Sequence, residues 1–247
     1  MVADHSTVLI ALLFFATALL YASVGNAGAT SYLAVMAFFG FLPEEMKSTA
    51  LALNVLVAAI ATFKFYQARR FSWQIFWPFA VTSVPFAYLG GRILLPAMLY
   101  KPIVSLILFY TAYLLLRLHP KSDQPVVDHR ASWWAALLSG AGIGFVAGLS
   151  GIGGGIFLGP LLILAGWAET QYAVGAAAAF NLVNSLAGLT GHLATISGLP
   201  DALPLWALAA GTGSWLGAEY GSRKLASQRL QQILAVILAI AGIKMLL

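Results

Sequence analysis

Two asparagines and two glycine-rich stretches are the features of this 247-residue sequence best suited to binding chemistry. Asn54 and Asn181 each lie in the middle of an apolar run, where a lone amide needs a polar partner. The glycine-rich stretches are SVGNAG, residues 23–28, and SGIGGG, residues 150–155. A helix that restarts after such a stretch presents unpaired N–H groups and the positive end of its dipole. Because these ends favour anions and glycine lets a ligand approach closely, the sequence predicts an oxyanion site.

Hydroxyl and amide side chains lie at or near both stretches and can hydrogen-bond an oxyanion. The predicted substrate-binding residues are Ser23, Asn26, Gly28, Thr30, Ser31, Asn54, Ser150, Gly153, Gly154, Gly155 and Asn181. Two structural alternatives stay open at this point. The asparagines can serve as polar contacts between helices, and the hydroxyls can bond the preceding helical turn.

The composition places the chain in a membrane. It is 61% hydrophobic and 9% charged, with a mean hydropathy of +0.89. Since soluble domains are about one quarter charged, the sequence predicts an all-α polytopic membrane protein. The N-terminus lacks a basic n-region, so we interpret it as a retained first membrane segment. The absence of cysteine excludes disulfides and thiolate metal sites, and we expect neither a metal nor a cofactor.

Ten apolar segments are arranged as five on each side of a polar stretch. They lie near residues 7–24, 29–41, 46–66, 73–95, 101–118, 132–149, 155–167, 172–193, 203–222 and 229–247. The expected organisation is a first transmembrane repeat over 1–118, a connecting loop over 119–131 and a second repeat over 132–247. An ungapped shift of 127 residues places Asn54 on Asn181, Ser23 on Ser150 and Gly28 on Gly155, which indicates an internal duplication.

Segment 29–41 and its counterpart in the second half hold only 13 residues each, about 20 Å of helix. The hydrocarbon core is about 30 Å thick, so we expect broken or re-entrant short helices at the glycine-rich motifs. Irregular backbone is tolerated at membrane depth only where protein or a cavity surrounds it. If each half of the chain crosses the membrane an odd number of times, 9 of the 13 Lys and Arg residues lie in loops on one side of the membrane and 4 lie on the other. The positive-inside rule therefore predicts inverted repeats, a cytoplasmic central loop and both termini outside the cytoplasm.

Inverted repeats with broken helices in matching positions are typical of secondary transporters that bind substrate near the membrane midplane. Glu219 and His192 are the candidate residues for coupling transport to protons. Glu219 has an alternative interpretation, in which its side chain extends to the membrane edge. The stretches GAGIGFVAG, residues 140–148, and GSWLGAEYG, residues 213–221, are predicted to be close helix-packing surfaces.

The string GIGGGIFLGPLL, residues 151–162, resembles the signature of the TauE/SafE sulfite-exporter family, as do the duplicated layout and the polar central loop. The resemblance covers essentially the whole chain. It implies a bacterial inner-membrane exporter, not an enzyme, for sulfur-containing anions such as sulfite or small organosulfonates. The first half departs from the pattern, because Asn26 and Leu33 stand where the second copy has Gly153 and Pro160.

Two other functions are compatible with parts of the sequence. The stretch GLSG, residues 148–151, matches the G-x-S-G of rhomboid intramembrane proteases, with His192 as a conceivable partner of Ser150. The longer glycine pattern and the absence of the motif around Ser23 count against that reading. An anion channel also uses broken helices, and the sequence does not separate it from a transporter.

Overall fold

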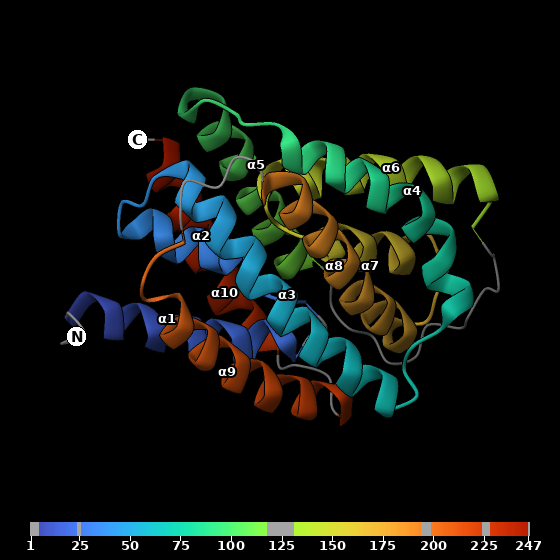
Figure 1. Cartoon of the computed structure of the whole chain (residues 1–247). Helices are drawn as coiled ribbons and strands as arrows, with labels where there is room; N and C mark the ends of the chain where they lie inside the picture. Colours follow the sequence, from blue (N-terminus) through green and yellow to red (C-terminus); the bar gives the residue numbers. More distant parts are fainter. Residues whose placement is uncertain (1–4, 24–25, 118–130, 194–198, 224–227, 247) are drawn as a thin grey trace.

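The computed structural model describes residues 5–23, 26–117, 131–193, 199–223 and 228–246, and these residues form ten α-helices (Figure 1). The first half contains α1 (His5–Ala22), α2 (Ala29–Phe38), α3 (Pro43–Gln67), α4 (Trp73–Arg92) and α5 (Ala97–Arg117). The second half contains α6 (Trp133–Ser150), α7 (Gly155–Leu164), α8 (Thr170–His192), α9 (Leu203–Arg223) and α10 (Gln228–Leu246). The predicted connecting loop falls almost entirely outside the described residues.

Each predicted apolar segment corresponds to one helix, and the described residues form no strand. Helix lengths run 18, 10, 25, 20 and 21 residues in the first half and 18, 10, 23, 21 and 19 in the second. Within the described ranges, five helices, α1, α3, α5, α6 and α8, are long and apolar enough to cross a membrane. The chain is an all-α multi-pass membrane protein.

Two parallel helix pairs flank the molecule, α1 with α9 and α4 with α6 (Figure 1). Along α6, glycines 140, 144 and 148 meet the backbone of α4 at residues 79, 83 and 87. Along α9, glycines 213, 217 and 221 meet the backbone of α1 at residues 15, 19 and 23. The predicted close packing at both stretches is confirmed, because in each pair no β-carbon separates the two backbones.

Helices α3 and α8 cross the centre between these pairs and run in opposite directions (Figure 1). Ser48 contacts His192 and Leu51 contacts Gly188. Asn54 contacts Ser185. Residue numbers therefore increase along α3 as they decrease along α8, which means that the two helices are antiparallel. This central pair brings the middles of the two halves together.

The short helices begin at Ala29 and Gly155, the two residues at which the sequence predicts a restart. Helix α2 packs against α1, α3 and α10, whereas α7 packs mainly against α8. Tyr32 of α2 meets the ring of Phe14 on α1 at 5.1 Å, and Leu158 of α7 shares a core with Ile143 of α6. The ten residues of each short helix span about 15 Å, half the thickness of the hydrocarbon core, so neither helix is long enough to cross a bilayer by itself.

One detail of the duplication is corrected at the breaks. Gly28 and Gly154 precede the short helices, both with left-handed backbone, at φ 83° and 88°. The helix starts are therefore 126 residues apart, since 155 − 29 = 126, and the ungapped shift of 127 is displaced there by one residue. The reason is that the chain needs a left-handed backbone conformation just before each short helix. Glycine adopts this conformation without steric cost, so the position of the glycine fixes where each helix begins.

Gly148→Ala is expected to lower the midpoint of thermal unfolding in detergent, measured by fluorescence-detected size exclusion. Its β-carbon would overlap the Ala87 carbonyl group, and such overpacking costs about 1–3 kcal/mol. Gly142→Ala is the matched control on the same helix, because a β-carbon there has no atom within 4 Å. Equal midpoints for the two variants would contradict the packing argument.

Candidate functional site

The second glycine-rich stretch is buried inside the protein, as irregular backbone at membrane depth requires. Every residue from 151 to 156 is buried. Gly151, Gly153 and Gly154 all have left-handed backbone, at φ 86°, 80° and 88°, which glycine adopts at no steric cost. These three residues allow the chain to leave α6 and enter α7 within a few residues.

Both repeat-matched asparagines reach this stretch. A β-carbon at Gly153 would collide with Asn54 Nδ2 and lie 2.8 Å from Asn181 Oδ1. It would also lie 2.6 Å from Ser185 Oγ. Glycine at 153 therefore leaves room for three polar side chains from α3 and α8 to converge on the backbone before α7.

Asn181 caps the first turn of α7. The Gly155 amide donates a hydrogen bond to Asn181 Oδ1 at 2.8 Å, and Asn181 is only 2% exposed. The first four N–H groups of a helix lack acceptors within the helix, so this bond satisfies one of them. The positive end of the α7 dipole thus points at the polar cluster.

Asn54 is fully buried and donates from Nδ2 to Ser185 Oγ at 2.6 Å. Its Oδ1 is buried without a hydrogen-bond partner among the described residues. Leaving a buried acceptor unpaired costs about 1–3 kcal/mol, and native structures have few such groups. This oxygen is therefore available to a ligand or a bound water.

Ser185 is a member of the cluster that the sequence analysis missed. Asn181 and Ser185 are four residues apart, so they lie on one face of α8. That spacing was the available signal, but one more serine in an apolar helix is common. Ser185 differs from the serines that bond a carbonyl of their own helical turn only because its side of α8 faces Asn54.

The hydroxyls predicted from the flanks of the breaks have local partners. Ser23 donates to Leu20 O at 2.7 Å and Ser150 to Val146 O at 2.6 Å, each within its own helix. Ser31 donates to Gly28 O at 2.7 Å. These bonds correspond to the structural alternative, because each hydroxyl satisfies a carbonyl at a helix end or in the preceding turn.

Three other predicted residues lie apart from the Gly153 cluster or face apolar groups. Thr30 of α2 donates to the hydroxyl group of Tyr21 on α1 at 3.2 Å. Asn26 has a buried Oδ1 with no hydrogen-bond partner in the described part of the chain. A β-carbon at Gly154 would meet apolar groups of α6 and α8 at 3.1–3.2 Å, so this residue borders the packing of these helices.

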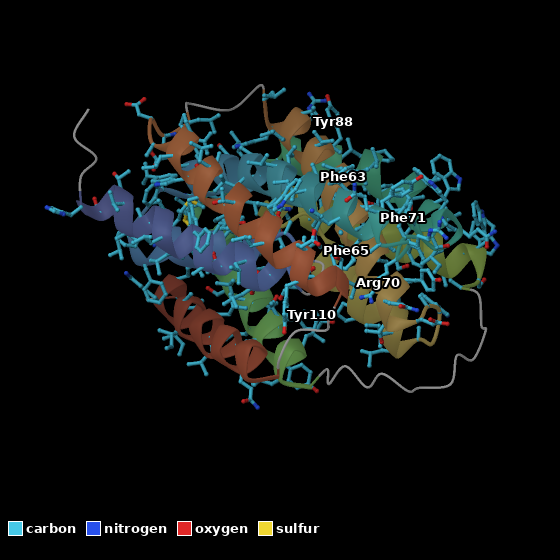
Figure 2. All side chains as sticks on the ribbon, turned by 90° about the horizontal axis from the view of Figure 1, so that it is seen from below. Phe63, Phe65, Arg70, Phe71, Tyr88 and Tyr110 are labelled. Atoms are coloured by element: carbon cyan, nitrogen blue, oxygen red, sulfur yellow. The ribbon has the colours of Figure 1, made fainter. Side chains whose placement is uncertain are left out.

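Glu219 forms an ion pair with Lys64, at 2.6 Å between Oε2 and Nζ. The Lys64 ammonium also lies 3.8 Å from the ring centroid of Trp215. This contact joins α3 to α9 near the C-terminal ends of both helices. Arg70 donates weakly to the Gly221 carbonyl group at 3.5 Å, beside the end of α9 (Figure 2).

His192 belongs to a second buried polar group, at the other end of α3. Its Nε2 lies 3.2 Å from Ser48 Oγ. The neighbouring Lys47 is 3% exposed and donates to the Gly91 and Ile93 carbonyl groups at 3.0 Å each. A cation at these carbonyls stabilises the C-terminal end of α4.

Ser150 and His192 do not pair, because the Ser150 hydroxyl bonds within its own helix and His192 lies against Ser48. The geometry that a serine protease needs between nucleophile and base is absent from these two described residues.

Comparison with known proteins agrees with this architecture. A family model described as sulfite exporter TauE/SafE matches residues 9–245. The chain belongs to the TauE/SafE family. It is 40% identical over 245 residues to the "Probable membrane transporter protein y4hK" of Sinorhizobium fredii, covering 98% of this chain and 99% of that protein.

A more distant relative of this TauE/SafE chain is the "Probable membrane transporter protein MJ0441" of Methanocaldococcus jannaschii. The two are 26% identical over 230 residues, covering 85% of this chain and 82% of the relative. No solved structure matches the chain. Family and relatives identify a membrane transporter.

Ser185→Ala should destabilise the TauE/SafE chain, because it leaves the buried Asn54 amide without its acceptor at a cost of about 1–3 kcal/mol. The measurement is the thermal midpoint in detergent. Ser139→Ala is the control, since the Ser139 hydroxyl bonds only Ala135 and Ala136 of its own helix. A Ser185→Ala midpoint no lower than that of the control would show that the Asn54 bond contributes nothing.

Proposed function

We propose that this TauE/SafE chain is a secondary transporter for sulfur-containing anions such as sulfite or small organosulfonates. The substrate site in this proposal is the polar cluster around Gly153, where α3, α8 and the start of α7 meet. Transport proceeds by alternating access, and the physiological direction is export across the bacterial inner membrane.

The convergence of Asn54, Asn181 and the first turn of α7 carries the proposal. Amide groups and a helix N-terminus together supply hydrogen-bond donors and a positive potential without a full charge. Such a site suits an oxyanion that must be released as well as bound. The unpartnered Oδ1 of Asn54 additionally accepts a hydrogen bond from a ligand or from its water.

An inverted duplication is supported by the antiparallel course of α3 and α8, the matched third helices of the two halves. A twofold rotation about an axis parallel to two helices leaves them pointing the same way. Two matched helices that run in opposite directions must therefore be related by an axis perpendicular to them. If α3 and α8 span the bilayer, that axis lies in the membrane plane, as in inverted-repeat transporters. The flanking pairs agree, because α1 contacts α9 as α6 contacts α4.

Alternating access requires that the cluster be closed from at least one side at a time. Toward Lys47, the side chain of Leu51 lies 3.3 Å from the position that a β-carbon at Gly188 would take. Toward the opposite end, Ala61 and Phe65 of α3 pack against Ala178 of α8. Both apolar layers are buried, so they separate the cluster from the two ends of the α3–α8 interface, as this part of the proposal requires.

Coupling to protons forms part of the proposal through Glu219 and His192. Each has a partner in the structure, Glu219 with Lys64 and His192 with Ser48. The two groups lie near opposite ends of α3, so a proton on either one would act on one end of the central helix pair.

Asn181→Ala is expected to raise the KM for sulfite about tenfold or more in proteoliposomes, since a hydrogen bond to a charged ligand contributes about 1.5–3 kcal/mol. Uptake and efflux of radiolabelled sulfite, thiosulfate and sulfoacetate would be measured with and without a pH gradient. Thr212→Ala is the control, because the exposed Thr212 hydroxyl bonds only its own helix. An unchanged KM in Asn181→Ala would remove Asn181 from the site.

The same assay separates the alternatives. Saturable flux with counterflow supports a transporter, whereas flux that rises linearly with concentration supports an anion channel. Absence of transport for all three anions, in a folded protein, would contradict the proposed substrate class.

The predicted orientation places the central loop in the cytoplasm. Because the chain contains no cysteine, Ser122→Cys creates a single thiol, and a membrane-impermeant maleimide should label it only in inside-out vesicles or lysed cells. Labelling in intact spheroplasts would reverse the orientation.

A further inference from the structure

An apolar groove of about 660 Å³ lies between α4 and α8, one helix from each half. Pro85, Tyr88 and Leu89 line it from α4, and Val183, Leu186 and Ala187 line it from α8. Tyr88, Leu89 and Leu186 are 40–48% exposed, and apolar side chains exposed to this extent on a membrane helix face lipid. The volume falls within the range of about 300–1,000 Å³ that is usual for small-ligand sites.

Backbone contacts hold the two walls of the groove together. Gly91 meets Gly188, and Gly191 meets the Tyr88 carbonyl group, so α4 and α8 touch without side chains between them at this end. Tyr88 accordingly lies beside the last turn of α8 (Figure 2). The α8 part of the groove, from 183 to 190, is about 10 Å long, a third of the hydrocarbon thickness.

The groove ends at a positive charge. Arg92 is exposed, follows Tyr88 by one helical turn, and holds its guanidinium 5.9 Å from the Tyr88 ring centroid. Lys47 next to it is only 3% exposed and donates to the carbonyl groups of Gly91 and Ile93, so Arg92 is the cation that a lipid headgroup would reach at this end of α4. An apolar groove with an exposed cation at one end complements an acyl chain that carries an anionic headgroup.

We propose that the α4–α8 groove is a specific phospholipid site, in which an acyl chain lies against Tyr88 and Leu186 and the lipid phosphate pairs with Arg92. The lipid contacts both halves of the chain, at the place where they touch through glycine. Its binding does not depend on which anion the protein transports.

Native mass spectrometry of the delipidated full chain tests this site with two lipids that share their acyl chains. Dioleoylphosphatidylglycerol should be retained at one molecule per chain and bind about tenfold more tightly than dioleoylglycerol, which lacks the phosphate. Arg92→Gln should reduce phosphatidylglycerol binding to the dioleoylglycerol level. Lys101→Gln, which removes an exposed positive charge from α5, should leave the preference intact.

A second pair of variants tests the groove itself. Thr190 is exposed and borders the groove, so Thr190→Phe fills it and should weaken binding of both lipids. Thr212→Phe places the same bulk on the exposed face of α9 and should change neither. Thermal midpoints confirm that all variants are folded. Unsaturable binding of many lipids would overturn the proposal. So would an affinity of Arg92→Gln for phosphatidylglycerol equal to that of the unmodified chain, or unchanged lipid binding in Thr190→Phe.

Discussion

Backbone groups inside a bilayer have no water to bond, and this constraint governs both broken helices of the chain. The second break satisfies it with protein. The Asn181 side chain accepts from the first turn of α7, and the residues of the second break are all buried. Lys47 does the same for the far end of α4, whose last carbonyl groups it bonds. Each of these hydrogen bonds joins two helices, α8 to α7 and α3 to α4. The unpaired backbone groups at a helix end therefore also help to position the neighbouring helix.

Close helix packing makes such caps possible. Where glycine replaces a larger residue, two backbones touch and a short side chain can reach the neighbouring helix. The flanking pairs α1–α9 and α4–α6 are built this way along three consecutive contacts each. The glycine series lies on α6 in one pair and on α9 in the other, which are not the matched helices of the two halves. The duplication matches α6 with α1 and α9 with α4, so the glycines of the two pairs come from helices that are not equivalent.

The two asparagines have unequal roles although they occupy matched positions. Asn181 caps α7, whereas Asn54 bonds Ser185 across the interface and keeps an unpartnered oxygen. The position matched to Ser185 in the first half is Ala58, since 185 − 127 = 58, so the first half lacks the equivalent hydroxyl. A substrate in this cluster would meet two chemically different walls. In the alternating-access cycle proposed above, unequal halves would allow the inward and outward states to differ in affinity, because these states need not mirror each other.

The sequence by itself determined the membrane class, the ten helices, the residues at which α2 and α7 begin, and the glycine packing stretches. Those features depend on composition, hydrophobic run length and glycine backbone freedom, which are local properties. Only the tertiary structure decided the partners of the polar side chains. Ser23, Ser31 and Ser150 bond their own turn or hairpin, while Ser185, with the same hydroxyl, faces Asn54, 131 residues away. Whether a hydroxyl bonds its own turn or a neighbouring helix depends on which side of its helix faces that neighbour. The local sequence does not encode this orientation.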